Sequence, residues 1–238
     1  MTNLAMWSGP RNISTAMMYA FGNRRDCVAW DEPFYAFSLV HHGNDHPMRE
    51  AIIAANDSDW NRLVSRCLAP AEKPLFYQKH MTHHMLEGFD RSWIKGLTNA
   101  FLIRAPERVL ASYAKKWPDV GLRDIGFVAQ AEIFNMVADH LGHAPPVADA
   151  EDILDDPLTV LTRLCAACGV PFDAAMLHWE SGPKPFDGVW APHWYNAAWA
   201  STGLAKPEAK PVELPDNLRR IADAARPYYE SMRRWRLT

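Results

Sequence analysis

Short apolar runs alternate along the chain with longer stretches in which apolar residues recur every three or four positions. The short runs predict buried strands, and the longer stretches predict helices. The expected strands are residues 4–7, 27–30, 75–79, 100–103 and 146–148. The expected helices are residues 16–21, 48–69, 106–114, 124–141, 157–167 and 214–235. Strands that alternate with helices indicate an α/β fold with a mainly parallel central sheet.

The remaining stretch, residues 181–212, is rich in proline and tryptophan and shows no clear period. Its aromatic side chains either cap a ligand pocket or pack over the core. No repeat or linker divides the chain, so its 238 residues predict a single domain, 1–238, that ends in the helix at 214–235.

Charge and composition limit the classes of partner. The net charge of −3 disfavours nucleic acid and an acidic membrane as partners, so any anion site has to be local. No apolar run reaches the roughly 20 residues of a membrane span, and the N-terminus lacks the order of a signal peptide. We therefore expect a cytoplasmic protein with no membrane partner. The oligomeric state stays open.

Cysteine and histidine spacing gives little reason to expect a metal. Cys165 and Cys168 form a single C-x-x-C with no second pair, and are more simply two small side chains on one helix face. His80, His83 and His84 lack the spacing of the helical zinc motif. We expect no metal site.

The loop at residues 8–15 has the features of a phosphate-binding loop. It follows the first strand and opens a helix, where backbone N–H groups and the helix dipole favour an anion. Ser14 and Thr15 add hydroxyl groups, and Arg11 adds a fixed positive charge. The loop lacks the second glycine and the lysine of the Walker A pattern. An ordinary turn in which Ser14 or Thr15 caps the helix is the alternative.

A second anion motif follows the fourth strand. Arg104 stands at the strand exit, and Ser112 lies about two turns into the next helix. An arginine fork and a serine hydroxyl in this arrangement can converge on one phosphate group.

Together the two motifs resemble the sulfotransferase family, which transfers sulfuryl groups from 3′-phosphoadenosine 5′-phosphosulfate (PAPS). Residues 10–15 stand where the family has its 5′-phosphosulfate loop, and Arg104-Ala-Pro106 through Ser112-Tyr113 matches its 3′-phosphate motif. Residues 150–157 and 169–172 also resemble family segments. Lys184, Gly188 and Trp190 are similar to a late segment that helps to hold the 3′-phosphate.

The resemblance implies a P-loop NTPase-like three-layer sandwich and a set of cofactor-binding residues. The residues implied for PAPS and its product PAP are Arg11, Asn12, Ser14, Thr15, Arg104, Ser112 and Lys184. Two positions depart from the family pattern. Arg11 replaces a lysine that stabilises charge on the bridging oxygen, and Ile13 replaces a glycine that allows close backbone approach.

Sulfuryl transfer to a hydroxyl or amine needs a general base, and two residues compete for that role. Glu32 lies in an Asp-Glu-Pro-Phe-Tyr segment that resembles heparan-type sulfotransferases. His80 lies in a Lys-His-Met segment that resembles small-molecule sulfotransferases. The ordinary pKa of a histidine already suits a base at neutral pH, whereas a glutamate needs burial to raise its pKa. The longer matching context favours Glu32.

The sequence therefore predicts a PAPS-dependent sulfotransferase that acts on a small-molecule acceptor, with Arg11 and either Glu32 or His80 as catalytic groups. A P-loop kinase for a small metabolite is one alternative, although no lysine stands in the loop. A nucleotide-binding protein without turnover is the other. The acceptor itself stays open.

Overall fold

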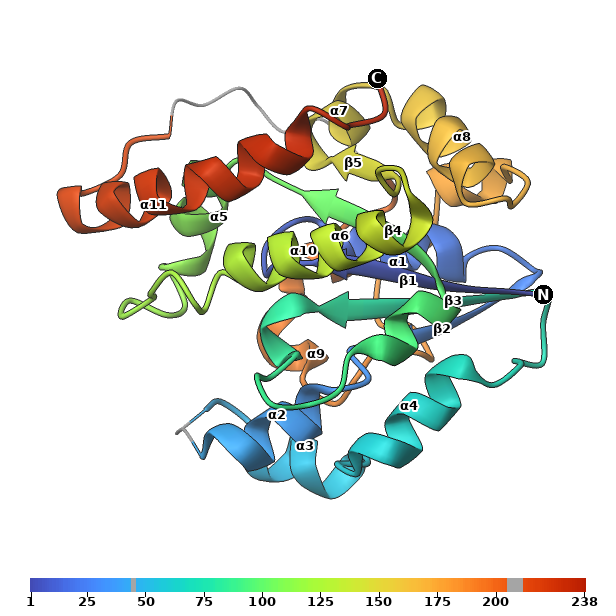
Figure 1. The fold of residues 1–238 in the computed structure, drawn as a ribbon, viewed down its shortest axis with the longest axis horizontal. Coiled ribbons are helices and arrows are strands. Elements are labelled where there is room, and N and C mark those ends of the chain that lie inside the picture. The colour runs from blue at the N-terminus through green and yellow to red at the C-terminus, as the bar shows by residue number, and fades with distance from the viewer. Residues whose placement is uncertain (44–45, 205–211) are drawn as a thin grey trace.

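Five parallel strands form the central sheet, in the order β2-β3-β1-β4-β5. The computed structural model describes residues 1–43, 46–204 and 212–238. The strands are β1 (Thr2–Ser8), β2 (Cys27–Asp31), β3 (Leu75–Met81), β4 (Thr98–Ile103) and β5 (Val147–Asp149). Figure 1 shows that the arrowheads of β3 and β4 point to the same side of the molecule. The expected mainly parallel sheet is confirmed.

Alternating side chains of the strands build two separate cores. In β1, Leu4 and Met6 belong to one cluster of buried apolar residues, and Ala5 and Trp7 to the other. In the same way β4 gives Leu102 to the first cluster and its neighbours in the strand to the second. This follows from the two-residue period of a strand, and it explains why the strands read as continuous apolar runs.

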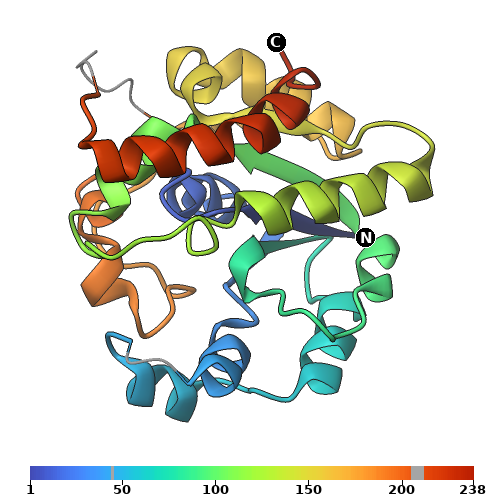
Figure 2. The ribbon, with the colours of Figure 1, turned by 60° about the vertical axis from the view of Figure 1, so that its left-hand side comes forward.

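Helices cover both faces of the sheet, which gives three layers. The helices of eight or more residues are α1 (Ser14–Gly22), α2 (Tyr35–His42), α4 (Trp60–Leu68), α5 (Pro106–Tyr113), α6 (Phe127–Leu141), α8 (Pro157–Ala167) and α11 (Asp216–Arg233). The shorter ones are α3 (Arg49–Ala55), η1 (Thr82–His84), η2 (Ser92–Gly96), α7 (Ala150–Asp155), η3 (Ala174–Leu177), α9 (Ala191–Trp194) and α10 (Asn196–Trp199). Figure 1 shows α6 and α11 in front of the sheet and α1 behind it, and Figure 2 shows α6 and α11 side by side.

The stretch at 48–69, expected as one helix, is two helices. Asp59 caps the start of the second helix, because its carboxylate accepts a hydrogen bond of 2.9 Å from the backbone N–H of Arg62. Asn56 donates to the carbonyl of Ile52 and closes α3. Short polar side chains that bond to nearby backbone interrupt a helix in this way. Both Figure 1 and Figure 2 place α2, α3 and α4 together beneath the sheet.

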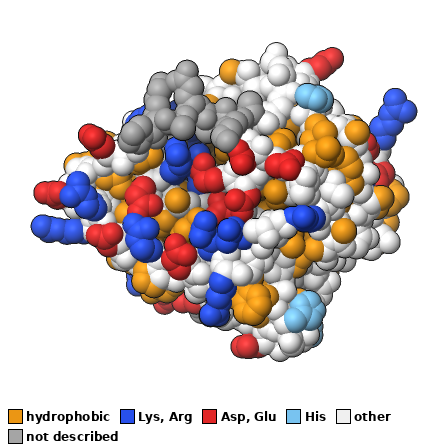
Figure 3. Space-filling model, turned by 90° about the horizontal axis from the view of Figure 1, so that it is seen from above, with side chains coloured by type: hydrophobic (Ala, Val, Ile, Leu, Met, Phe, Trp, Pro, Cys, Tyr) orange, Lys and Arg blue, Asp and Glu red, His pale blue; other side chains and the backbone are white. Residues whose placement is uncertain are grey.

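The stretch at 181–212 carries the short helices α9 and α10, and its residues 205–211 lie outside the described residues. The closing helix α11 starts and ends two residues inside the expected range. Figure 3 shows basic and acidic side chains intermixed on the face seen from above. Among the described residues, no helix combines the length and apolarity that crossing a membrane requires.

Candidate active site

The loop after β1 has a strained backbone conformation and leads into α1 at the carboxyl edge of the sheet. Arg11 and Ile13 have positive φ angles of 62° and 55°, which non-glycine residues seldom adopt. Gly9 is required where it stands, because a Cβ there would lie 2.3 Å from the carbonyl oxygen of Ile125. Ile13 precedes α1 and gives no side-chain cap. The first backbone N–H groups of α1 therefore lack a capping side chain.

The two anion motifs meet at this loop. Arg11 donates a hydrogen bond from Nε to Ser112 Oγ (2.8 Å), and Arg104 donates from Nη1 to the carbonyl of Arg11 (3.1 Å). Arg104 also forms an ion pair of 2.9 Å with Glu151, in the first turn of α7. These contacts fix both guanidinium groups beside the start of α1. Burial and the nearby Arg104 charge lower the pKa of Arg11.

A cavity of about 360 Å³, here cavity A, opens beside these groups. Its charged lining comes from the two motifs, and its apolar lining comes from the start of α1, from α7, and from α9, α10 and the residues after them. The lining residues are Arg11, Ile13, Ser14, Thr15, Ala16, Arg104, Ser112, Leu154, Trp194, Tyr195, Ala197, Ala198, Ser201, Gly203 and Leu204. No carboxylate is among these described residues, so cavity A suits an anion with an apolar part.

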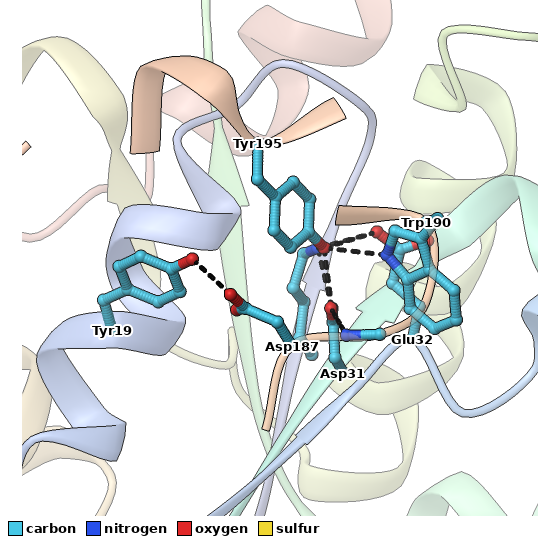
Figure 4. A network of polar contacts seen from close by, with 8 residues as sticks. Tyr19, Asp31, Glu32, Asp187, Trp190 and Tyr195 are labelled. Atoms are coloured by element: carbon cyan, nitrogen blue, oxygen red, sulfur yellow. Dashed lines mark hydrogen bonds and ion pairs between the residues drawn. The ribbon is translucent and has the colours of Figure 1, made fainter. Parts of the chain in front are cut away.

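A buried ionic network lies next to cavity A (Figure 4). Lys79, near the end of β3, donates to Asp31 (2.9 Å) and Glu32 (2.6 Å). Asp31 is the last residue of the neighbouring strand β2, and Glu32 follows it. The Tyr195 hydroxyl contacts the Asp31 carboxylate at 2.8 Å and accepts a hydrogen bond from Trp190 Nε1 at 3.0 Å. The network therefore ties the segment after residue 181 to the edge of the sheet.

Burial and neighbouring charges shift the pKa values of Glu32 and Lys79 in this network. Desolvation raises the pKa of Glu32, and the neighbouring Lys79 charge opposes that rise. Burial alone would lower the pKa of Lys79, but the Asp31 and Glu32 carboxylates outweigh it and raise that pKa. Glu32 also has a positive φ of 40°, a conformation that costs energy and is held by its surroundings. A buried carboxylate with a raised pKa has the property that a general base needs.

A second, smaller cavity of about 80 Å³, cavity B, joins these groups to the loop. It shares Arg11, Ser14 and Thr15 with cavity A and reaches Glu32 and Lys79. The remaining lining residues of cavity B are Pro10, Tyr35, His46, Met81, His83, Tyr113, Trp194 and Tyr195. Cavity B therefore brings candidate anion-binding groups and a candidate base to one pocket.

His80 lies on the other face of the sheet and does not line these cavities. It pairs in register with Trp7, and the two rings stack with centroids 4.4 Å apart. Its Nε2 contacts Gln78 Oε1 at 3.1 Å, and burial lowers its pKa to about 3. Because strand side chains alternate, Lys79 and Met81 face cavity B and His80 faces away.

Two further predicted residues are not brought to the cavities. Asn12 is fully buried and donates to the carbonyl of Leu102, so it anchors the loop to β4. Lys184 donates to the carbonyl groups of Glu180 and Gly182 and lies over the Tyr19 ring, 5.4 Å from its centroid. Neither residue lines cavity A or cavity B.

Sequence analysis gave no role in the site to Lys79 or His83, although both line cavity B. It included Tyr195 only among the aromatic residues of 181–212 that either cap a ligand pocket or pack over the core. The signal for Lys79 was its place before His80 at a strand end. Either the Lys79 or the His80 side chain can face the cavities, because neighbouring side chains of a strand point to opposite faces. The sequence of one strand does not reveal which of the two does. Among the described residues, no three histidine, cysteine, aspartate or glutamate side chains lie together as a metal site.

The fold is an α/β sandwich with cavities at the carboxyl edge of its sheet, and comparison with known proteins gives the family. A family profile described as "Sulfotransferase domain" matches residues 1–236, so the chain belongs to the sulfotransferase family. The curacin-pathway sulfotransferase domain shares the fold at TM-score 0.52 and 15% identity, covering 93% of this chain and 96% of that one. A sulfotransferase from Alicyclobacillus acidocaldarius does so at TM-score 0.56 and 12% identity, covering 98% and 95%. The expected P-loop-like α/β fold is confirmed.

Two curated relatives come from Arabidopsis thaliana, branched-chain-amino-acid aminotransferase-like proteins 1 and 2. They are 33% and 32% identical to this chain over 228 residues, which is 95% of its length. The chain spans only 41% and 40% of their length. Their aminotransferase-like names therefore describe proteins more than twice as long as this chain.

Proposed function

We propose that the protein transfers a sulfuryl group from PAPS to a hydroxyl or amine of a small-molecule acceptor. The observation that carries this proposal is the convergence of Arg11, Arg104 and Ser112 on cavity A, at the start of α1. A 3′-phosphate and a 5′-phosphosulfate together carry several negative charges. Two guanidinium groups, three hydroxyl groups and a helix N-terminus supply the matching donors.

In this proposal, Arg104 and Ser112 bind the 3′-phosphate. Arg11, Ser14 and Thr15 bind the 5′-phosphosulfate, at the boundary between cavity A and cavity B. Asn12 acts indirectly, by holding the loop against β4. Arg11 has a second task, because its charge stabilises the bridging oxygen as the bond to sulfur breaks.

Glu32 is the proposed general base. An S–O bond forms to the acceptor oxygen, or an S–N bond where the acceptor is an amine, while the S–O bond to the donor phosphate breaks. The acceptor proton passes to the Glu32 carboxylate, and PAP leaves with the bridging oxygen. Lys79 holds that carboxylate in place, because its ammonium group bonds both Glu32 and Asp31. His80 is not proposed as the base, because it faces away from cavity B.

The decisive test is thermal stabilisation by PAP beside ADP, and by ATP with and without Mg²⁺. A ligand at a hundred times its Kd stabilises the folded chain by about 2.7 kcal/mol. At roughly 2–4 °C per kcal/mol for a chain of this size, the unfolding midpoint rises by several degrees. A rise with PAP alone supports the proposal. A rise only with Mg²⁺-ATP contradicts it and favours the kinase.

A further inference from the structure

A third cavity of about 510 Å³, cavity C, continues from cavity B on the side away from cavity A. Cavities B and C share the side chains of Tyr35, His46, His83 and Tyr113. Cavity A and cavity C share none of their lining residues. A molecule in cavity C therefore reaches Glu32 through cavity B, opposite the proposed donor site. The volume of cavity C is in the range of small-molecule sites.

Two imidazole nitrogen atoms in the wall of cavity C have no hydrogen-bond partner among the described residues. They are Nδ1 of His83 and Nδ1 of His84, and both atoms are buried. The His84 residue is only 2% exposed, and its ring stacks on Tyr35 with centroids 4.6 Å apart. A buried polar atom without a partner is costly, so these atoms point to a ligand that supplies one.

Both histidines are neutral at physiological pH. Burial lowers the pKa of His83 to about 3, with smaller contributions from His46 and His42. Burial also lowers the pKa of His84, and neighbouring His83 adds to this. A neutral imidazole accepts a hydrogen bond from a hydroxyl group, but it does not neutralise an anion.

The charged groups of cavity C do not favour an anion either. Its lining holds two arginines, Arg91 and Arg123, against three carboxylates, Glu87, Asp124 and Glu132. Arg91 is already paired, because its guanidinium contacts Glu132 at 3.2 Å. Cavity A shows the opposite composition, with Arg11 and Arg104 and no carboxylate in its described lining. Cavity A therefore favours an anionic ligand, and cavity C does not.

The rest of cavity C offers aromatic and aliphatic surface to a ring. Tyr113 and Trp117 contribute aromatic faces, and Leu39, Leu122 and Val128 contribute aliphatic ones. Flat apolar walls around a few polar atoms are typical of sites for small ring-bearing molecules.

We propose that the acceptor is a compact, ring-bearing molecule without negative charge that carries several hydroxyl groups. The hydroxyl groups that do not react donate hydrogen bonds to His83 and His84 in cavity C. This inference rests on the proposed function and narrows it. The reacting hydroxyl oxygen lies in cavity B, beside Glu32. Anionic glycans and carboxylated phenols are disfavoured by the same surface.

The test compares matched acceptors that carry three hydroxyl groups and differ by one carboxylate, such as pyrogallol and gallate, with PAP formation as the readout. We expect kcat/KM for the neutral phenol to exceed that for the carboxylated phenol by tenfold or more. Glu87 is exposed in the wall of cavity C. Glu87→Lys should lower the ratio of the two kcat/KM values, because it replaces a negative charge near the acceptor with a positive one. Equal or better use of the carboxylated phenol, or of a sulfate-accepting glycan, overturns the inference.

A cavity-filling variant tests where the acceptor binds. Leu122 lines cavity C and neither cavity A nor cavity B, so in Leu122→Trp transfer to pyrogallol should fall at least tenfold while the Kd for PAP stays unchanged. Leu141→Trp is the control, because Leu141 is exposed at the end of α6 and lines none of the cavities. Unchanged transfer in Leu122→Trp overturns the assignment of cavity C.

PAP binding distinguishes a failure of the proposed function from a failure of the acceptor assignment. If PAP does not bind, the proposed function fails and takes the acceptor assignment with it. If PAP binds but neither neutral phenols nor neutral alcohols are sulfated, only the acceptor class is wrong.

Discussion

Arg11 Nε donates a 2.8 Å hydrogen bond to Ser112 Oγ, and so joins two motifs that lie 101 residues apart in the chain. Arg104 completes the connection through the carbonyl of Arg11. The 5′ and 3′ anion sites that we propose are therefore one connected structure. A change in either motif is expected to affect the other.

Arg104→Ala should weaken PAP binding about ten- to hundredfold, as expected when hydrogen bonds to a charged group are lost. Calorimetric titration with PAP measures this change. Arg108→Ala is a matched control, because Arg108 also approaches Glu151, at 3.5 Å, but does not line cavity A. Equal losses in the two variants would show that Arg104 acts only through Glu151.

Glu32→Gln should lower kcat by about 10²- to 10⁴-fold, the usual contribution of a general base. PAP binding should persist, because cavity A does not include Glu32. The parent enzyme should lose turnover as the pH falls through the raised pKa of Glu32, since a protonated carboxylate accepts no proton.

His80→Asn is the companion to Glu32→Gln, because it changes the other residue that the sequence suggested as a base. We expect turnover within about threefold of the parent, since His80 packs against Trp7 on the opposite face of the sheet. If this variant loses turnover and Glu32→Gln does not, the base assignment is reversed.

Lys79→Met should destabilise the fold by about 3–5 kcal/mol, because it leaves two buried carboxylates without their cation. Denaturant unfolding measures the change. Adding Asp31→Asn to Lys79→Met should recover part of the loss, since one of the two stranded charges is then removed. A double variant no more stable than Lys79→Met would show that charge is not the cause.

Acid should destabilise the protein through His80, whose burial lowers its pKa to about 3. Between that value and about 6.5, the unfolded chain binds a proton at His80 and the folded chain does not. Stability therefore falls as the pH falls through this window, by up to about 1.4 kcal/mol per pH unit.

His80→Phe should flatten this slope, measured as the unfolding free energy from pH 6.5 to 4. Phe101→Leu is the control, because Phe101 belongs with Trp7 to the apolar cluster against which His80 packs, and it is not a titrating group. A slope that stays the same in His80→Phe would mean that His80 takes up its proton in the folded state.

The sequence was informative where local pattern decides structure. Strands show as apolar runs because both of their faces are buried, and Arg104 and Ser112 stand at a spacing that a strand exit and a helix impose. It was less informative where a side chain's direction depends on the neighbouring strand. Lys79 and His80 are adjacent, and only the pairing of β3 with β1 and β2 shows which one faces Glu32.

Long-range contacts were also hidden from local pattern. Tyr195 reaches Asp31 across 164 residues, and no spacing rule connects them. The break between α3 and α4 was readable in principle. Asn56 and Asp59 are the kind of residue that ends one helix and starts another, but the apolar period continues through them and favours a single helix.

Trp194 and Tyr195 wall both cavity A and cavity B, on a segment that other hydrogen bonds hold shut. Tyr19 bonds Asp187 at 2.9 Å, and the Gly188 N–H bonds Asp31 at 3.1 Å. We expect these bonds to slow the release of a molecule bound behind this wall, because the segment is held in place from both sides. For the donor that we propose in cavity A, we expect the contacts that limit the entry of water also to delay the departure of PAP, so protection of the donor and speed of exchange oppose one another.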